Sequence, residues 1–416
     1  LITKLQNIKN LPPGVLKKFP DCSDAVRSAS DRVDLACLDL LGDALNWRLT
    51  KAEESRAAKL FSAMGELERA VLSISELLHD ALDEVPEESR AEQAVSEAGL
   101  ALMRFSELAA LCAKWREWKE NQDSIFWMEK ARTKDGDSFA RLYVTPLDIG
   151  AIMNESVYEP FRSILCLSAT LSVGGRFDFW KNRVGLSRSD HRALCAEFPS
   201  PFPFHKNALL AAADDAPMPD APGWQDWINS AVARLIEASG GHALVLFTSY
   251  TSLRSAWDAV KPKLDALGIS AFRQGDDERS RLMEKFKADI SSVLFATDSF
   301  WEGVDAPGDT LQLVIMTKLP FRVPTDPVQM ARSEAIEARG GNSFMDLSLP
   351  EAVIRFKQGF GRLIRHSDDR GAVAVLDARI LKKRYGKLFI ESLPDTKTSF
   401  KELSAIAHDI REFLLR

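Results

Sequence analysis

Three side chains near the carboxyl end of the sequence carry its clearest chemical signal. Gln358, Arg362 and Arg365 are four and three residues apart, a spacing that would place them on one side of a helix. Guanidinium groups stay charged at physiological pH and match phosphate oxygens bidentately, so this pattern predicts a phosphate-binding group. A solvated basic face on an ordinary amphipathic helix is the alternative interpretation.

The surrounding sequence predicts the helix that would position these residues. Ser348 and Glu351 have the spacing of a capping box, and Pro350 suits a first helical turn. The opposite side of the helix is apolar at helical spacing, which predicts that it packs into a core. Its residues are Val353, Phe356, Phe360, Leu363 and Ile364. Gly359 and Gly361 each cost roughly 1 kcal/mol against alanine in a helix, so they indicate close approach of another group.

Strand and helix patterns alternate from Trp224 onward, which predicts a parallel sheet covered on both faces. The predicted strands are Ala243–Phe247, Ser270–Arg273, Val293–Ala296, Leu311–Met316 and Ala372–Leu376. In such sheets, ligands meet the loops at the carboxyl ends of the strands. Polar stretches begin at three of these ends, at Thr248, Thr297 and Lys318. Each could be a plain turn, but three in one sheet, together with the arginines, favour one phosphate-binding or nucleic-acid-binding surface.

The amino-terminal part follows a different pattern. Apolar residues recur at helical spacing over about Asp24–Lys119, which predicts three or so long helices packed antiparallel. Beyond them, strands are predicted at Phe139–Val144 and Ile164–Leu167, with a helix over Ile149–Phe161 between them. A proline-rich linker then precedes the predicted sheet. We therefore expect domain boundaries near residues 138 and 203.

Composition and charge narrow the classes of function. The chain has 416 residues and a net charge of −6, which argues against a nucleic-acid coat but allows a local basic channel. Its five cysteines form no C-x-x-C pair and none has a histidine at zinc-finger spacing, so we expect buried, reduced cytoplasmic thiols. No run approaches the ~18 apolar residues of a membrane span. Because the first residue is Leu1, we expect the sequence to be part of a longer chain.

Four stretches, in this order, resemble the DinG branch of the superfamily 2 DNA helicases, the group that includes XPD-like enzymes. They are Ser168-Ala-Thr-Leu171 for the third helicase motif, Leu244–Tyr250 for the fourth, Ala296–Asp305 for the fifth and Gln358–Arg365 for the sixth. The W-E-G-V-D and Q-G-F-G-R-L-I-R runs are the specific ones. The resemblance covers about Phe139–Leu393, and the helical part resembles the arch domain of the family mainly by its position.

The resemblance implies roles at the nucleotide. Arg362 and Arg365 would be arginine fingers that neutralise charge on the transferring phosphoryl group, and Gln358 would position water or a phosphate oxygen. Asp305 would accept a hydrogen bond from the ribose, with Gly303 beside it at the nucleotide. No residue of the chain is assigned to a metal.

The resemblance also implies a coupling loop and a DNA-facing surface. The coupling loop, which would link the nucleotide state to domain movement, comprises Ser168, Ala169 and Thr170. The DNA-facing residues would be Thr248, Ser249, Thr297 and Glu302. Hydroxyl donors to phosphate oxygens would hold DNA without reading its sequence.

The fold implied is α/β, with a RecA-like parallel sheet and an all-α arch-like domain. Residues 1–138 would form the arch-like domain, and residues 204–416 would form helicase domain 2. Residues 139–203 would be the terminal part of helicase domain 1, with the Ser-Ala-Thr motif, and a linker. The implied protein is an ATP-dependent DNA helicase or translocase that acts on single-stranded or forked DNA, as a cytoplasmic monomer in DNA repair.

The cofactors implied are ATP and Mg²⁺, but the sequence contains neither G-x-x-x-x-G-K-[ST] nor a D-E-A-H-like box. We expect both motifs upstream of Leu1, so the chain alone should be inactive. The full-length protein could carry an iron–sulfur cluster upstream, but this segment should not. The alternative is a non-catalytic DNA-binding or partner-binding module derived from a helicase. The sixth motif favours the enzyme, because a binding module has no use for arginine fingers.

Overall fold

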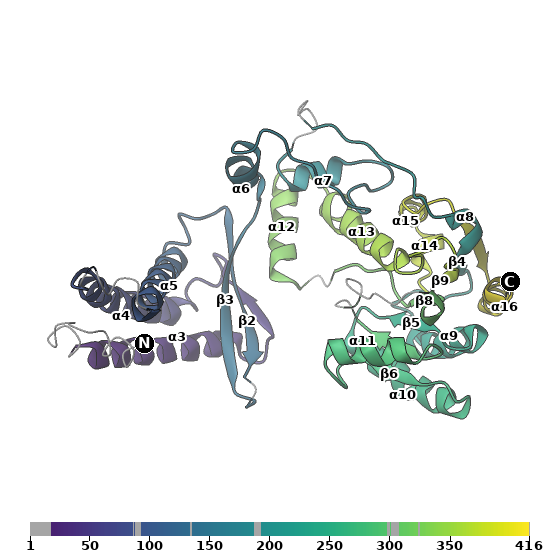
Figure 1. Cartoon of the computed structure of the whole chain (residues 1–416), viewed down its shortest axis with the longest axis horizontal. Coiled ribbons are helices and arrows are strands. Elements are labelled where there is room, and N and C mark those ends of the chain that lie inside the picture. The colour runs from purple at the N-terminus through teal and green to yellow at the C-terminus, as the bar shows by residue number, and fades with distance from the viewer. Residues whose placement is uncertain are drawn as a thin grey trace. The chain divides into compact units, whose positions relative to one another are not determined.

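The computed structural model describes residues 18–85, 87, 93–133, 135–186, 193–297, 300, 308–322 and 325–415. Its backbone contacts divide the chain into two compact units (Figure 1). The first consists of Leu1–Ile149 with Pro324–Glu334, and the second of Gly150–Val323 with Ala335–Arg416. Each unit is built from two separate stretches of the sequence, so the chain passes between them more than once.

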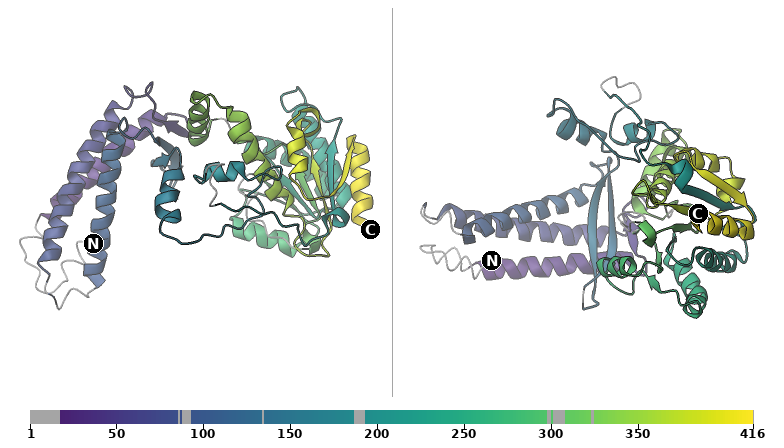
Figure 2. Two further views of the ribbon diagram at one scale, coloured as in Figure 1. Left: turned by 90° about the horizontal axis from the view of Figure 1, so that it is seen from above. Right: turned by 45° about the vertical axis from the view of Figure 1, so that its right-hand side comes forward.

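The first unit contains three long helices that lie side by side, with a β-hairpin at one end of them (Figure 2). The helices are α3 (Phe19–Leu41), α4 (Ala58–Asp83) and α5 (Gln93–Arg116). The strands are β1 (Asn46–Arg48), β2 (Ser124–Arg132) and β3 (Ser138–Pro146), paired antiparallel in the order β1-β2-β3. The predicted long helices are therefore confirmed, while the hairpin spans position 138, where the sequence predicted a boundary.

The core of the first unit joins the helices to the hairpin. Trp115 on α5 is fully buried, and its ring meets that of Phe126 on β2 edge to face, with the centroids 5.5 Å apart. The first part of α12 (Pro327–Ala338) also belongs to this unit. There, Arg48 Nη2 donates to both carboxylate oxygens of Glu334, at 2.7 and 2.8 Å. This ion pair holds a segment from far along the sequence against β1.

The second unit is built on a seven-stranded sheet with the order β10-β4-β9-β8-β5-β7-β6, and every pairing in it is parallel. Its strands are β4 (Ala208–Ala213), β5 (Ala243–Leu246), β6 (Ala271–Arg273), β7 (Val293–Ala296), β8 (Leu313–Met316), β9 (Gly371–Val375) and β10 (Lys397–Lys401). The predicted parallel sheet is confirmed. Strands β4 and β10 were not predicted, because β4 is mostly alanine and leucine and β10 is a polar edge strand.

Helices cover both faces of this sheet. The longer ones are α9 (Trp224–Ser239), α10 (Tyr250–Ala266), α11 (Arg279–Ala288), α13 (Leu349–Phe360) and α16 (Leu403–Leu415). Helices α9, α10 and α16 pack on one face, and α11 and α13 on the other. Alternate strand residues serve the two layers, as with Val245 on the first face and Leu244 on the second. The α/β class predicted from the sequence is thus observed.

Shorter elements complete the second unit. They are α6 (Gly150–Met153), a π-helical turn (Asn154–Tyr158), α7 (Asp178–Arg183), α8 (Phe204–Asn207), a 3-10 turn (Gly308–Thr310), a π-helical turn (Phe344–Ser348), α14 (Arg379–Lys382) and α15 (Gly386–Glu391). The strand predicted at Ile164–Leu167 is wrong. These residues are extended but unpaired, and Leu165 and Leu167 are about four-fifths exposed, at 80% and 79%. An apolar run forms a strand only where a partner strand is available, and the described residues provide none.

Thiol chemistry provides a test of this packing. Burial, helped by Asp34, raises the pKa of the Cys37 thiol to about 12, and burial raises the pKa of Cys112 to about 11. Cys166 and Cys195 are exposed, so the expectation of buried thiols is wrong for these two. We predict that an alkylating reagent at pH 8 labels Cys166 and Cys195 in the native protein and Cys37 and Cys112 only after unfolding, because thiolate is the reactive form. Peptide mass mapping measures this, and native labelling of Cys37 would contradict it.

Candidate functional site

Helix α13 lies at the centre of the candidate site, and it begins differently from the prediction. Ser348 is itself helical, with φ −65° and ψ −43°, and its side chain caps nothing. A π-helical turn runs into α13, and Asn342 Oδ1 accepts from the backbone N–H of Met345 at its start. Glu351 does not fold back on Ser348, because it pairs with Arg183 and Arg322 at 3.4 and 3.2 Å. The predicted capping box is therefore wrong.

The apolar side of α13 is buried as predicted, but the arginines are not on the helix. Val353, Phe356 and Phe360 are each at most 1% exposed and lie in the core beneath the sheet. The helix ends at Phe360, and the chain turns at Gly361, where an added Cβ would come within 3.2 Å of the Lys357 carbonyl oxygen. Arg362 and Arg365 therefore lie in the loop that follows, and the predicted helical face shared with Gln358 is wrong.

A buried carboxylate fixes the loop that carries these arginines. Asp369 is 9% exposed, and its Oδ2 accepts from the backbone N–H groups of Arg365 and His366, at 2.7 and 2.8 Å. Asn207 Nδ2 donates to the Ser367 carbonyl at 2.7 Å. Sequence reasoning did not single out Asp369. Asp369 could have been found from the local sequence, because it is an aspartate at the end of a polar loop, two residues before Gly371, which begins β9.

Gln358 remains on α13, where its side chain is half-buried. Its Oε1 is shielded from solvent and accepts no hydrogen bond from the described residues. Buried side-chain oxygens are nearly always paired, so this one has room for a donor from a ligand or water. The neighbouring Lys357 is engaged instead with protein groups.

The predicted coupling loop is tied to α13 through Lys357. The hydroxyls of Ser168 and Thr170 lie 3.1 Å apart in an exposed turn that also contains Ala169. Ser172 lies two residues after Thr170, and Lys357 Nζ donates to its carbonyl and hydroxyl oxygens, at 2.9 and 3.3 Å. Burial lowers the pKa of Lys357, and the charge of Glu197 opposes this shift. The contact thus joins the residues directly after Ser168–Leu171 and directly before Gln358.

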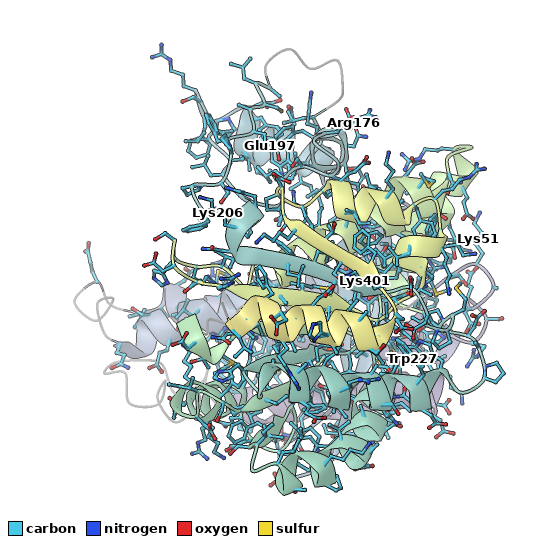
Figure 3. The ribbon with its side chains drawn as sticks, turned by 90° about the vertical axis from the view of Figure 1, so that its right-hand side faces the viewer. Lys51, Arg176, Glu197, Lys206, Trp227 and Lys401 are labelled. Atoms are coloured by element: carbon cyan, nitrogen blue, oxygen red, sulfur yellow. The ribbon has the colours of Figure 1, made fainter. Side chains whose placement is uncertain are left out.

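The segment after the predicted coupling loop is held by two further contacts with other segments. Ser172 Oγ donates to Glu197 Oε1 at 3.0 Å. The chain then makes a tight turn between Val173 and Arg176, whose glycines both have positive φ, and the N–H of Gly174 donates to Ser392 Oγ at 2.9 Å. Glu197 and Arg176 both belong to the segment before β4 (Figure 3), where Arg176 pairs with Asp178. The segment that follows the Ser168–Thr170 loop is therefore held in place by contacts with other segments.

The predicted DNA-facing residues lie at the carboxyl edge of the sheet, after the adjacent strands β5 and β7. Thr248 is half-buried, and Ser249 caps α10, with its Oγ accepting from the Ser252 N–H at 3.2 Å. Thr297 is only 6% exposed. Its N–H and hydroxyl both donate to Gln274 Oε1, at 2.6 and 3.0 Å. Thr297 thus faces Gln274 rather than solvent.

Parallel topology separates the two groups of candidates. The arginine loop directly precedes β9, so it lies at the amino edge of the sheet, whereas Thr248 and Thr297 follow strands and lie at the carboxyl edge. The expectation of one shared surface is therefore wrong. Glu302, Gly303 and Asp305 lie outside the described residues. Within the described part, no group of histidine, cysteine or acidic side chains is arranged to hold a metal ion, and no helix is long and apolar enough to cross a membrane.

This chain is similar to a helicase family model and to two curated helicases. Residues 232–396 match the family model for a helicase C-terminal domain. The chain is 38% identical to the ATP-dependent helicase DinG of Mycobacterium tuberculosis over 303 residues, which cover 72% of this chain and 44% of that protein. It is 37% identical to the ATP-dependent DNA helicase YoaA of Escherichia coli, covering 61% of this chain and 39% of that protein. The chain thus spans less than half the length of these relatives.

A third relative is the 3'-5' exonuclease DinG of Bacillus subtilis, which is 35% identical and is matched over 67% of this chain and 30% of its own length. Among solved structures, Xpd4 of S. tokodaii aligns with 95% of this chain and 70% of its own chain, at 13% identity and a TM-score of 0.48. A second XPD structure, without ligand by its title, covers 96% and 71% at a TM-score of 0.47.

The Asp369 contacts lead to a stability prediction. In Asp369→Ala, two backbone N–H groups lose a charged acceptor in a shielded position, so the free energy of unfolding should fall by about 2–3 kcal/mol. The midpoint of urea denaturation of the 416-residue chain measures this loss. Asp368→Ala is the matched control, because Asp368 is exposed and its hydrogen bond among the described residues comes from Ser367 Oγ. Equal midpoints for the two variants would show that Asp369 does not hold the loop.

Proposed function

This chain belongs to the DinG-like, XPD-related helicase family, and we propose that it supplies the second motor domain and the arch of an ATP-dependent DNA helicase or translocase. The substrate proposed is single-stranded or forked DNA. The observation that carries the proposal is the loop between α13 and β9, where a buried carboxylate sets the backbone of Arg365. A solvated basic face needs no such support, so the fixed loop favours a defined ligand for these arginines.

At the amino edge of the sheet, the proposed ligand is ATP. Arg362 and Arg365 act as arginine fingers that stabilise charge on the transferring phosphoryl group, and Mg²⁺ bound with the nucleotide neutralises further charge there. The unsatisfied Oε1 of Gln358 suits a water molecule beside the phosphate. Gly303 and Asp305 are proposed to contact the nucleotide, with the ribose hydroxyl donating to Asp305. The phosphate cradle and metal carboxylates would come from another part of the full-length protein.

At the carboxyl edge, the proposed ligand is the DNA backbone. Ser249 Oγ uses a lone pair in the helix cap, so its O–H remains able to donate to a phosphate oxygen. Thr248 is proposed to lie along the same path, and the buried Thr297 contributes by holding Gln274. Glu302, which lies outside the described residues, is proposed as a further DNA contact. Contacts of this kind position the backbone without reading base sequence.

We propose that the Ser168–Thr170 loop couples the nucleotide state to movement between domains. Its support is the attachment of Ser172 to Lys357, the residue directly before Gln358. The exposed apolar run Ile164–Leu167 supports assigning residues 139–203 to the end of helicase domain 1, because a strand of another sheet would be apolar on both faces. Residues 1–138 are then proposed as the arch and residues 204–416 as helicase domain 2.

The chain by itself should hydrolyse ATP negligibly, since its sequence has neither a phosphate-binding loop nor an acidic box for Mg²⁺. It should still bind single-stranded DNA weakly, with an affinity that falls as salt rises. Phosphate release and DNA anisotropy assays on the purified 416-residue chain measure both. Robust DNA-stimulated ATP turnover by this chain would refute the proposal that the phosphate cradle and the metal carboxylates come from another part of the full-length protein.

In the full-length protein that contains this chain, Arg362→Ala and Arg365→Ala should each lower kcat by about 10³-fold or more. Lysine replacements should not restore activity, because a point charge cannot reproduce the planar fork. Nucleotide affinity should change less than kcat, because the fingers act mainly on the transition state. Arg384→Ala is the control, since Arg384 is an exposed surface residue. Equal, mild losses for all three positions would support the solvated-face interpretation.

A further inference from the structure

The carboxyl edge of the sheet holds an aromatic residue, the last of the Leu244–Tyr250 stretch, to which the family resemblance gave no role. Tyr250 is the first residue of α10, directly after Ser249, and it is 51% exposed. Its hydroxyl accepts from Gln274 Nε2 at 2.7 Å. Gln274 follows β6, which is the neighbour of β7 in the sheet. The exposed side chain of Tyr250 is thus held through a hydrogen bond to its hydroxyl group.

Gln274 links this tyrosine to the start of the next loop. Its amide oxygen accepts from both the N–H and the hydroxyl of Thr297, and its amide nitrogen reaches Tyr250. Because the oxygen of the amide is fixed by two donors, its nitrogen can point in only one direction. The hydroxyl of Tyr250 is therefore fixed as well, and the exposed ring loses much of its rotational freedom before any ligand arrives.

The start of α10 offers a hydrogen-bond donor for a phosphate group beside the ring. The hydroxyl of Ser249 lies next to Tyr250 in the sequence, at the positive end of α10. Asp276 and Glu278, which follow Gln274 in the sequence, are acidic and exposed, so Ser249 and the start of α10 are the groups beside the ring that favour phosphate.

We propose that Tyr250 is a base-stacking residue for single-stranded DNA and that Gln274 is the positioning residue that aims its ring. The inference rests on the proposed function and deepens its DNA site. Every base has a π-face, so a stacking platform grips DNA without sequence preference, in keeping with backbone contacts from the neighbouring hydroxyls. A ring held in advance binds more tightly, because less freedom is lost on binding.

The test uses the 416-residue chain and anisotropy of a labelled oligothymidylate of about 15 nucleotides, a length that covers typical single-strand sites. Tyr250→Ala should raise Kd by about 5- to 100-fold, as expected for one lost stack. Tyr250→Phe keeps the ring but loses the hydrogen bond from Gln274, so it should weaken binding about as much as Gln274→Ala does and less than Tyr250→Ala does. Leu267→Ala is the matched control, because Leu267 is 53% exposed and follows the other end of α10. Tyr250→Leu serves as a second ring-less variant if the alanine variant fails to fold.

An abasic oligonucleotide of the same length separates stacking from a structural effect. Tyr250→Ala should bind the abasic strand as tightly as the unsubstituted chain, because no base is present to stack. Equal weakening on both strands would overturn the inference, since a damaged site would lose phosphate contacts too. Unchanged binding to oligothymidylate would also overturn it. If the unsubstituted chain binds neither strand, the proposed DNA site itself fails.

The role of Gln274 is tested by a double-mutant cycle. Gln274→Ala should weaken binding to oligothymidylate less than Tyr250→Ala does. Without Gln274 the Tyr250 ring is still present and can stack on a base, but it must lose its rotational freedom when DNA binds. In the Tyr250→Ala background, Gln274→Ala should have no further effect. Additive losses would show that Gln274 contributes independently of the ring and would overturn its assignment as a positioning residue.

Discussion

A parallel sheet buried on both faces imposes one constraint on its connecting loops. Each loop must lie at one of two edges, formed by the amino ends or by the carboxyl ends of the strands. In the second unit every strand pair is parallel, so loops before strands and loops after strands face opposite ways. The arginine loop precedes β9, and the hydroxyl-bearing turns follow β5 and β7. The fold therefore separates the phosphoryl-transfer candidates from the nucleic-acid candidates by the full length of the strands, and any communication between them must cross the sheet.

Helix α13 is suited to carry that communication, because it spans the same distance and is held at both ends by charge. Near its start, Glu351 pairs with two arginines from separate segments. Near its end, the partly buried Lys357 binds the backbone of Ser172. A charged group away from water is stabilised only when its partners stay in place. Between these points the helix is packed by apolar side chains that tolerate little displacement, so it should move as a rigid body.

Sequence periodicity predicted what depends on burial and missed what depends on competition between partners. The apolar side of α13 followed from spacing alone, because only one face could enter the core. The helix start did not, since a π-helical turn that Asn342 caps runs directly into α13, and Glu351 pairs with arginines distant in sequence. Gln274 carries no local signal, and its importance appears only when three neighbouring strands bring Tyr250 and Thr297 to it.

The ion pair between Arg48 and Glu334 joins residues separated by 286 positions, and this has a consequence for biosynthesis. A chain that leaves the ribosome from its amino terminus makes the three long helices and the hairpin early. The last helical segment of that unit emerges only after β8 of the other unit. The helical unit must therefore wait, incomplete, while the strands up to β8 are synthesised. Contacts of such long range slow folding, so β1 should complete its packing late in the synthesis of the chain.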